Sequence, residues 1–413
     1  MRTAFLSLTL LCAAGGAGCT STNSTVVPPP QPPFSNAEQA VYAFPLTGGN
    51  RPVGGLLALG GTLYGTAAKT SNSCCGAVYG IKPDGSGYTT LHSFNGTDGT
   101  KPQSDLILYG GRLWGTATDG GGGSCPLGCG TVFSVDPNGG GAKVEYTFNG
   151  GAHDGAYPYG GLVAMNGLLY GTTINGGIHC PSKGCGTIFE INPASGKERL
   201  IFRFDGSDGA YPYGNLIAGS GGVLYGTTAN GGDACPGHGC GTVFEVHATQ
   251  RSEKILHRFA GGTKDGAHPF AGLVRIGSEL WGTTVNGGTH GYGTAFAVNT
   301  SPGKEVEMYS FKGGSDGAYP RAALVAQNGT LYGTTTRGGG KCHVVNGCGT
   351  VFSLVTANGA ETVLHAFAST PDGHDPFAVP ILVGGKLYGT TESGGIEPGC
   401  NLNGCGTIYS VTI

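Results

Sequence analysis

The chain has 413 residues, a net charge of −3 and only 11% charged residues, so it lacks the basic patch typical of nucleic-acid-binding proteins. Glycine (83 residues) and proline (23 residues) make up about a quarter of the chain, a share that raises the question of low-complexity disorder. The glycines are periodic, however, and alternate with aliphatic and aromatic residues, which indicates turns between strands. We therefore expect a folded protein that binds no nucleic acid.

The N-terminus has the pattern of an export signal. Arg2 provides a positive charge, residues 4–14 form an apolar run, and Gly16-Ala17-Gly18 is a small-residue cleavage site. The run is shorter than the roughly 20 residues that span a bilayer. The ending before Cys19 resembles the lipobox of bacterial lipoproteins. This resemblance implies that Cys19 is diacylated and, if the cell has two membranes, that the protein is sorted to the outer membrane. The alternative is an ordinary secreted protein without lipid.

The segment after Cys19 is rich in Ser, Thr and Pro and has no apolar period. Such a composition is typical of a semi-rigid spacer. We therefore divide the chain into a signal peptide (1–18), a linker after the lipidated cysteine (19–37) and a folded domain (38–413).

Seven copies of a two-part motif fill the folded domain. In the fourth copy the first part is Leu-Tyr-Gly-Thr-Thr at residues 224–228, and the second is Gly-Cys-Gly-Thr-Val-Phe at residues 239–244. The aromatic residue of the first part recurs every 50–56 residues, at Tyr64, Trp114, Tyr170, Tyr225, Trp281, Tyr332 and Tyr388. This fixed period indicates one repeat array in place of two or three separate domains.

Each repeat contains four strand-length runs, and no stretch has a convincing helical period. The runs are β-branched or aromatic and are bounded by Gly, Asn or Asp; in the fourth copy they are residues 215–218, 223–228, 242–246 and 254–259. Tight turns such as Asn166-Gly167 and Asp136–Gly139 join neighbouring runs. The sequence therefore predicts an all-β fold, a seven-bladed β-propeller of four-stranded antiparallel blades.

The two ends of the folded domain predict how the ring closes. The last repeat ends with its third strand at residues 407–412. Residues 41–44 match the fourth strand of other copies, such as residues 91–94 and 256–259. We expect this N-terminal strand to complete the last blade, which leaves no open sheet edge.

Three motifs recur in the same order in nearly every copy: L-[YW]-G-T-[TA]-x-x-G-G, G-C-G-T-[VI]-[FY] and D-G-x-x-P. This pattern resembles the GloVer tandem repeat of exported bacterial choice-of-anchor proteins, which is itself reminiscent of Kelch-type propellers. The resemblance covers residues 41–413. It implies surface anchoring and a propeller fold, and it implies no established activity.

Ten cysteines form five close pairs, each around the loop between the second and third strands: Cys125/Cys129, Cys180/Cys185, Cys235/Cys240, Cys342/Cys348 and Cys400/Cys405. The fifth repeat has lost both cysteines together, as disulfide partners should. Two cysteines per loop are fewer than the four ligands of a structural zinc site, and export favours disulfides. The pairing of the adjacent Cys74 and Cys75 stays open.

Six repeats carry an Asp-Gly pair shortly before a proline, at Asp98, Asp154, Asp208, Asp265, Asp316 and Asp372. We expect each Asp to accept a backbone N–H within a turn. Calcium binding is the alternative, but no second acidic ligand has the spacing of a calcium loop. Histidines at equivalent strand positions, His92, His257 and His365, are interpreted as scaffold. We expect no metal and no cofactor.

The repeats differ from one another on both sides of the proline that precedes the first strand. The preceding residues are Arg51, Lys101, Tyr157, Tyr211, His268, Tyr319 and Asp375, and the following residues are Val53, Gln103, Tyr159, Tyr213, Phe270, Arg321 and Phe377. If the first strand lines the channel, these positions lie at its mouth, where aromatic and polar groups together suit binding. The candidate ligand-binding residues are Tyr157, Tyr159, Tyr211, Tyr213, His268, Phe270, Tyr319, Arg321 and Asp375. The alternative is that the aromatic residues pack against neighbouring blades.

No nucleophile elbow, zinc-protease motif, phosphate loop or dinucleotide fingerprint is present, so no catalytic residue is assigned. The leading hypothesis is an exported, lipid-anchored, monomeric surface propeller that binds a glycan or a protein partner on the face of the long loops. The first alternative is a carbohydrate-active lyase or hydrolase that uses His268, Arg321 and Asp375, because propellers support many chemistries. The second is a purely structural envelope protein.

Overall fold

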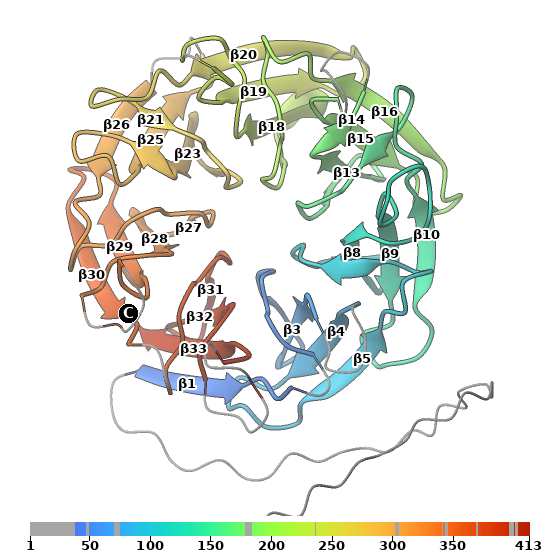
Figure 1. Ribbon diagram of the computed structural model, residues 1–413, viewed down its shortest axis with the longest axis horizontal. Coiled ribbons are helices and arrows are strands. Elements are labelled where there is room, and N and C mark those ends of the chain that lie inside the picture. The colour runs from blue at the N-terminus through green and yellow to red at the C-terminus, as the bar shows by residue number, and fades with distance from the viewer. Residues whose placement is uncertain are drawn as a thin grey trace, which may run out of the picture. The chain divides into compact units, whose positions relative to one another are not determined.

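The computed structural model describes residues 38–46, 49–69, 75–177, 184–235, 237–301, 305–340, 342, 346–368, 371–395, 400 and 404–413. These residues form a ring of seven antiparallel blades (Figure 1). The predicted seven-bladed propeller is confirmed. Within the described ranges, no helix is long and apolar enough to cross a membrane.

In blades 1 to 6 the strands run from the channel to the rim in chain order. Blade 1 contains β2 (Leu57–Leu59), β3 (Thr62–Ala67), β4 (Ala77–Ile81) and β5 (Thr89–Ser93). Blade 2 contains β7 (Ile107–Tyr109), β8 (Arg112–Asp119), β9 (Thr131–Val135) and β10 (Lys143–Thr147), with β6 (Thr100–Pro102) paired to β8. Blade 3 contains β12 (Val163–Met165), β13 (Leu168–Thr173), β15 (Thr187–Ile191) and β16 (Glu198–Arg203).

Blades 4 to 6 repeat this order, and in blade 7 the outermost strand is the first strand of the chain. Blade 4 contains β17 (Ile217–Ala218), β18 (Val223–Thr228), β19 (Thr242–His247) and β20 (Ser252–Arg258). Blade 5 contains β22 (Val274–Ile276), β23 (Glu279–Thr284), β25 (Thr294–Asn299) and β26 (Glu305–Ser310). Blade 6 contains β27 (Val325–Gln327), β28 (Thr330–Thr335), β29 (Thr350–Val355) and β30 (Glu361–Ala366). Blade 7 contains β31 (Ile381–Val383), β32 (Lys386–Thr391), β33 (Thr407–Thr412) and β1 (Glu38–Ala43).

The ring closes as the sequence predicts, through β1. This strand pairs antiparallel with β33, with Ala43 opposite Thr407, and Figure 1 shows the two ends of the colour scale side by side. Phe44 follows β1, is fully buried, and donates its N–H to the carbonyl of Gly406 at 2.9 Å. The first and last strands of the propeller therefore share one sheet.

The glycine of the Leu-Tyr-Gly-Thr-Thr motif makes room for an aromatic ring in its own blade. Gly226 on β18 lies opposite Phe244 on β19, and both belong to fully paired strands. A Cβ atom on Gly226 would lie 2.5 Å from Cζ of Phe244 and 2.9 Å from Cδ2 of Leu216. The motif is thus explained by packing between strands.

Gly226→Ala is expected to lower the free energy of unfolding by about 1–3 kcal/mol, because the added methyl group overpacks a filled core. The change is measured by denaturant unfolding against the wild type. Gly221→Ala is the control for backbone entropy, since no atom lies within 4 Å of a Cβ there; its left-handed φ of 72° carries a strain of its own. A Gly226→Ala protein as stable as the wild type would contradict this packing.

The predicted turns are present. Asn166 and Gly167 both have positive φ angles, 52° and 81°, as a two-residue hairpin turn requires. Each Asp of the six Asp-Gly pairs accepts the N–H of the residue that follows the buried phenylalanine, and these donors are Asn95, Asn149, Asp205, Ala260, Lys312 and Ala368. The turn function of these aspartates is confirmed.

Both long connections of a repeat lie at the same end of the blade, as the sequence predicts. In blade 3 they even pair, because β11 (Gly155–Ala156) forms a short ladder with β14 (Asn175–Gly176). An equivalent ladder joins β21 (Gly266–Ala267) and β24 (Asn286–Gly287). These small ladders were not predicted, because two-residue strands leave no periodic pattern.

Four of the predicted disulfides are present, Cys125–Cys129, Cys235–Cys240, Cys342–Cys348 and Cys400–Cys405, with Cα atoms 5.1–5.6 Å apart. Cys185 and Cys75 are also disulfide-bonded. Cys180 and Cys74 lie outside the described residues. Disulfides form in oxidising compartments, which agrees with export.

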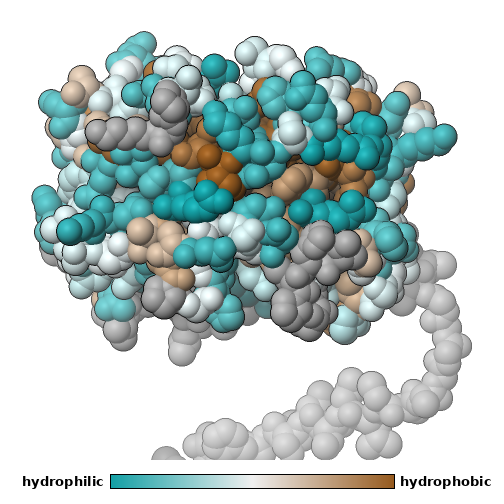
Figure 2. Space-filling model, turned by 90° about the horizontal axis from the view of Figure 1, so that it is seen from above, coloured by the Kyte–Doolittle hydropathy of each residue, from teal (hydrophilic) through white to brown (hydrophobic). Residues whose placement is uncertain are grey.

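The side of the ring drawn in Figure 2 is mainly hydrophilic, and hydrophobic side chains show only in small recessed areas. The apolar residues are instead buried between neighbouring blades. In the cluster between blades 3 and 4, for example, Ile188, Phe204, Leu224 and Phe244 are fully buried.

Candidate functional site

The residue before each of the seven prolines has a left-handed backbone, and none of these residues is glycine. Their φ angles lie between 52° and 61°, at Arg51, Lys101, Tyr157, Tyr211, His268, Tyr319 and Asp375. This region costs a residue with a Cβ atom roughly 1–2 kcal/mol, and a following proline favours extended backbone instead. Each of the seven positions therefore carries a side chain, although its backbone conformation costs conformational energy that glycine would avoid.

Two backbone hydrogen bonds hold each left-handed residue. In blade 4 the N–H of Tyr211 donates to the carbonyl of Cys185 at 2.8 Å, in the preceding blade. The carbonyl of Tyr211 accepts the N–H of Ala229 at 3.1 Å, in its own blade. Because the strained turn is bonded on both sides, it has the same shape in every blade while its side chain varies.

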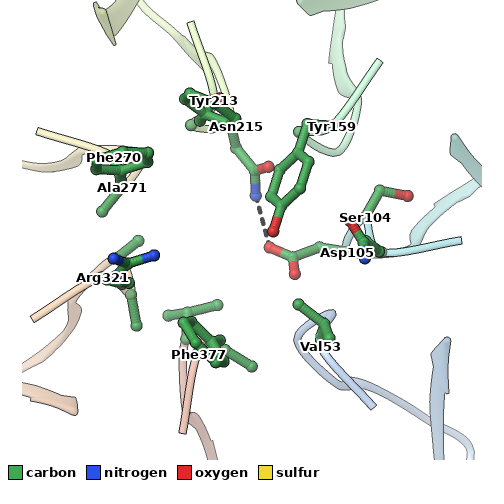
Figure 3. A pocket seen from close by; sticks show the side chains of 18 residues that line it. Val53, Ser104, Asp105, Tyr159, Tyr213, Asn215, Phe270, Ala271, Arg321 and Phe377 are labelled. Atoms are coloured by element: carbon green, nitrogen blue, oxygen red, sulfur yellow. Dashed lines mark hydrogen bonds between the residues drawn. The ribbon is translucent and has the colours of Figure 1, made fainter. Parts of the chain in front are cut away.

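This turn separates the two sets of candidate residues. The seven residues after the prolines all line one cavity of about 100 Å³ on the channel axis (Figure 3), and they are Val53, Gln103, Tyr159, Tyr213, Phe270, Arg321 and Phe377. The seven residues before the prolines do not line it. Of the nine candidates, the structure thus brings Tyr159, Tyr213, Phe270 and Arg321 together.

Aromatic rings form a continuous arc along one side of this cavity. The ring centroids of Tyr159 and Tyr213 are 5.3 Å apart, and those of Tyr213 and Phe270 are 4.8 Å apart. The guanidinium of Arg321 continues the arc, 5.3 Å from the Phe270 centroid and 5.6 Å from that of Phe377. Burial raises the pKa of Tyr159 and of Tyr213, so both hydroxyls stay protonated.

A carboxylate of blade 2 and an amide of blade 4, both in the lining of the cavity, bond to each other past blade 3. Oδ2 of Asp105 accepts a hydrogen bond of 2.5 Å from Nδ2 of Asn215, which lies 110 residues further along the chain (Figure 3). Oδ1 of Asp105 accepts the N–H of Gly55, and Oδ1 of Asn215 accepts the N–H of Gly161, both at 2.5 Å. Burial raises the pKa of Asp105, while the bonds from Gly55 and Asn215 lower it. Blades 1 to 4 are joined by this network.

Sequence reasoning missed Asp105 and Asn215, although a signal existed. The other five repeats carry Gly, Ala or Val at this position, namely Gly55, Gly161, Gly272, Ala323 and Val379. β17 begins at Ile217, two residues later than predicted, at the same distance from the proline as the first strand of every other blade. Asn215 lies before the ladder between β17 and β18 and bonds to Asp105 of blade 2.

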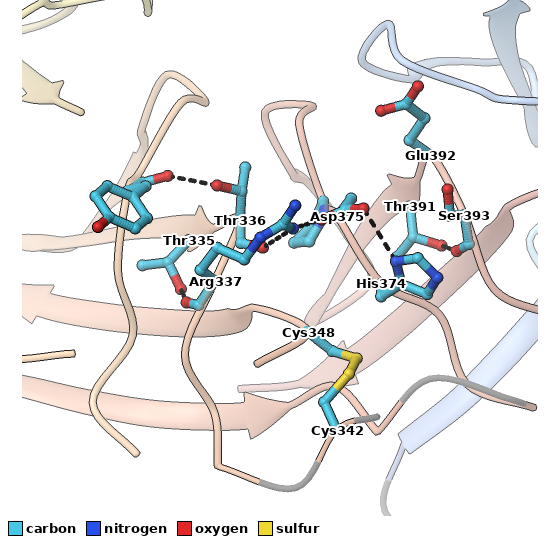
Figure 4. A network of polar contacts seen from close by, with 12 residues as sticks. Thr335, Thr336, Arg337, Cys342, Cys348, His374, Asp375, Thr391, Glu392 and Ser393 are labelled. Atoms are coloured by element: carbon cyan, nitrogen blue, oxygen red, sulfur yellow. Dashed lines mark hydrogen bonds and ion pairs between the residues drawn. A yellow bond between two sulfur atoms is a disulfide. The ribbon is translucent and has the colours of Figure 1, made fainter. Parts of the chain in front are cut away.

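On the face of the long loops, blades 6 and 7 share a network of charged residues (Figure 4). The guanidinium of Arg337 in blade 6 forms an ion pair with Asp375 in blade 7. Oδ2 of Asp375 also lies 3.0 Å from Nδ1 of the buried His374. The candidate Asp375 is therefore held by a cation on one side and an imidazole on the other.

Further charged pairs continue this network around the ring. Arg51 of blade 1 pairs with Glu392 of blade 7, and Lys101 pairs with Asp119 within blade 2, with Nζ and Oδ2 2.7 Å apart. The loop face is thus asymmetric. Blades 6, 7, 1 and 2 contribute residues to charged pairs, whereas the left-handed residues of blades 3 to 6 are Tyr or His.

The remaining candidates contact the neighbouring blade. Tyr157 and Tyr211 pack partly against the buried clusters between blades. Nδ1 of His268 lies 2.9 Å from the carbonyl oxygen of Ala229 in blade 4, and the ring of Tyr319 lies 5.8 Å from that of Tyr292. Each of these four side chains thus contacts a neighbouring blade with one part and is exposed to solvent with another. The alternative interpretation, packing between blades, therefore holds for them in part.

His268, Arg321 and Asp375, the candidates of the enzymatic alternative, have separate partners. His268 contacts Ala229, Arg321 lies over two phenylalanine rings, and Asp375 pairs with Arg337 and His374. Among the described residues, no hydrogen bond, ion pair or ring contact joins any two of the three.

A sequence profile of the Gloeobacter/Verrucomicrobia repeat matches residues 17–239 and 236–413. The chain belongs to this repeat family. The resemblance read from the three motifs is therefore confirmed, while the relation to Kelch-type propellers stays an expectation. No curated protein matches this member of the Gloeobacter/Verrucomicrobia repeat family.

Solved structures share the fold of this repeat protein at low identity. An oligogalacturonate lyase in complex with manganese is 13% identical, with a TM-score of 0.55 over 86% of each chain. The extracellular domain of a putative one-component system from B. thetaiotaomicron is 9% identical, with a TM-score of 0.51 over 88% of this chain and 40% of that one. At these identities the likeness concerns the fold alone.

Proposed function

We propose that this protein is an exported surface propeller that binds a glycan at the channel mouth. The arc of Tyr159, Tyr213 and Phe270, continued by Arg321, is the observation that carries the proposal. Sugar rings present C–H faces that pack on aromatic rings, and their hydroxyl groups need directional polar partners. Tyrosine hydroxyls and a guanidinium supply such partners beside the apolar faces.

The size of the cavity favours recognition of one end of a glycan. Its volume of about 100 Å³ is smaller than the roughly 300–1,000 Å³ of pockets that enclose a whole small molecule. A terminal sugar would enter the mouth, and the rest of the chain would lie across the loop face. The charged pairs of blades 6, 7, 1 and 2 favour a glycan that carries charged or strongly polar groups.

Tyr213→Ala is expected to weaken glycan binding by about 30-fold, equivalent to about 2 kcal/mol, because the central ring of the arc is lost. The measurement is a glycan array followed by titration calorimetry with the best ligand. Tyr109→Ala is the matched control. Tyr109 is a partly buried tyrosine at the far end of β7, where its hydroxyl bonds to the carbonyl of Gly167. Equal losses in the two variants, or an array without any ligand, would contradict the proposal.

The enzymatic alternative makes a different prediction. The structural likeness to an oligogalacturonate lyase makes acidic oligosaccharides sensible test substrates, although fold likeness does not transfer activity. If the wild type cleaves such an oligosaccharide, and His268→Ala abolishes this cleavage without loss of stability, a lyase or hydrolase is favoured over a binding module. A purely structural envelope protein would show neither binding nor turnover.

The proposed location is the bacterial cell envelope, with a signal peptide at 1–18, a lipid anchor on Cys19 and a linker to residue 37. Support comes from the lipobox-like residues before Cys19, which lie outside the described residues, and from the disulfides, which need an oxidising compartment. Incorporation of a radioactive fatty acid would test the anchor, and Cys19→Ser is expected to abolish this labelling. Membrane fractionation of the wild type would test the proposed outer-membrane sorting.

A further inference from the structure

The seams between neighbouring blades on the outer side of the ring contain paired carboxylates. An Asp of an Asp-Gly turn faces a Glu at the start of the next blade's outer strand in four seams: Asp154 with Glu198, Asp208 with Glu253, Asp265 with Glu305, and Asp316 with Glu361. Burial and then the charge of the facing aspartate raise the pKa of Glu198, Glu253 and Glu361. Each glutamate also has a buried Oε1 atom without a hydrogen-bond partner.

The residue that joins the two carboxylates differs between seams. In the seam of blades 5 and 6, the hydroxyl of Tyr309 donates to Asp316 at 2.5 Å and to Glu361 at 3.4 Å. A tyrosine hydroxyl has a proton to donate, and it partly neutralises the repulsion between the carboxylates. The seam of blades 4 and 5 has His257 at the equivalent position, with Nε2 3.3 Å from Oδ2 of Asp265.

With histidine in place of tyrosine, the seam of blades 4 and 5 brings three possible metal-ligand atoms together. A nitrogen of His257 and carboxylate oxygens of Asp265 and Glu305 all lie within 4.8 Å of one another, and no other such trio occurs among the described residues. The 3.3 Å between Nε2 and Oδ2 matches the separation of about 3.4 Å expected for two ligands on one tetrahedral ion with bonds of about 2.1 Å.

The same seam carries more negative charge than its own groups balance. Glu307 lies two residues after Glu305 and therefore on the same face of β26. Its Oε2 is also buried without a hydrogen-bond partner. Asp265, Glu305 and Glu307 thus place three carboxylates in the seam beside the imidazole of His257.

The aspartate is already oriented for coordination. The N–H groups of Ala260 and Gly266 donate to its two oxygens at 2.6 and 2.7 Å, which fixes the carboxylate plane. The side chains of His257 and Asp265 are 17% and 13% exposed, so an ion can reach the seam from the rim.

We propose that His257, Asp265 and Glu305 bind a divalent transition metal of the Mn²⁺ or Zn²⁺ type at the seam between blades 4 and 5. An imidazole ligand disfavours Ca²⁺ and Mg²⁺, which prefer all-oxygen sites, and favours first-row transition metals. The ion would link the outer strand of blade 4 to that of blade 5. This site replaces the sequence-based expectation that the protein binds no metal.

The site would give blade 5 a cross-link that its sequence otherwise lacks. Blade 5 is the one repeat with no cysteine in the loop between its second and third strands. The proposed ion therefore acts on stability, and it is separate from the glycan site at the channel mouth.

The test adds Mn²⁺, Zn²⁺ or Ca²⁺ to protein stripped with a chelator. Titration calorimetry and, for Mn²⁺, electron paramagnetic resonance are expected to show one ion per chain, and the melting temperature is expected to rise. Ca²⁺ is expected to bind at least 10-fold more weakly than Mn²⁺ or Zn²⁺.

His257→Tyr is the sharpest variant, because it gives this seam the residue found at Tyr146 and Tyr309. We expect it to fold, to lose metal binding by at least 10-fold and to lose the metal-dependent rise in melting temperature. Asp316→Asn, in the tyrosine seam, is the control and should bind metal as the wild type does. Absence of Mn²⁺ and Zn²⁺ binding to the wild type, or unchanged binding by His257→Tyr, would overturn the proposal.

Discussion

A protein without strand β1 is expected to lose the native ring at 37 °C. The strand supplies the outer edge of blade 7 and carries Tyr42 and Ala43, with Phe44 just after it, all buried. Losing one buried phenylalanine alone costs about 3–5 kcal/mol, and a domain of this kind is stable by only about 5–15 kcal/mol. The deletion also exposes β33 as an unpaired edge. Circular dichroism and size-exclusion chromatography of a chain that begins after residue 46 test this.

The point substitution Phe44→Ala measures how much the closing segment contributes to stability without removing the strand. Phe44 is one of seven equivalent buried phenylalanines, the others being Phe94, Phe148, Phe204, Phe259, Phe311 and Phe367. If closure is part of the cooperative unit, Phe44→Ala and Phe204→Ala should each lower the free energy of unfolding by about 3–5 kcal/mol. A loss below about 1 kcal/mol for Phe44→Ala alone would show that blade 7 closes without contributing to global stability.

Stability is expected to fall as the pH rises from about 4.5 to 7. Burial and neighbouring negative charge raise the pKa of Glu198, Glu253 and Glu361 from 4.5 to about 7. Between these two values the folded chain holds protons that the unfolded chain has released, so the slope of stability against pH is negative. After a discount for partial exposure, each group contributes about 1 kcal/mol. The full cost is present above pH 7 and absent below pH 4.5.

Urea unfolding midpoints at pH 5 and pH 8 measure this effect, with a chelator present to keep the seam of blades 4 and 5 free of metal. The wild type should be more stable at pH 5 by about 3 kcal/mol, the sum over the three glutamates. A triple variant with Gln at positions 198, 253 and 361 should show a flatter dependence and a gain in stability at pH 8. A midpoint that does not change between the two pH values in the wild type would show that these carboxyl groups titrate normally.

The fold could be predicted from the sequence because the same strand and turn motifs recur in all seven repeats. Residues 407–412 were predicted as the last strand, and β33 has these bounds. The closing strand was predicted at residues 41–44 and found at Glu38–Ala43, so it begins three residues earlier and ends one residue earlier than predicted. The first strand of blade 4 was predicted too long, since it was expected at residues 215–218 and β17 spans Ile217–Ala218.

The candidate site was predictable only in part. Variation around the proline identified the seven residues that line the cavity, because a scaffold does not require variety there. The bond between Asp105 and Asn215 joins residues 110 positions apart, and no local pattern reports such a contact. The seam residues were missed for another reason. His257, Asp265 and Glu305 lie in two different repeats, and their equivalents serve as ordinary scaffold elsewhere in the ring.

The left-handed turn before each proline also bears on how such proteins diversify and on how they can be engineered. Both backbone bonds of Tyr211, and those of its counterparts, involve main-chain atoms only. Exchanging the side chain therefore leaves the supporting bonds in place, whereas a change two positions later also alters ring contacts in the cavity. Each blade thus offers two addressable sites on a fixed frame, one at the loop face and one in the channel. A new specificity can be grafted onto this ring residue by residue, without rebuilding a single loop.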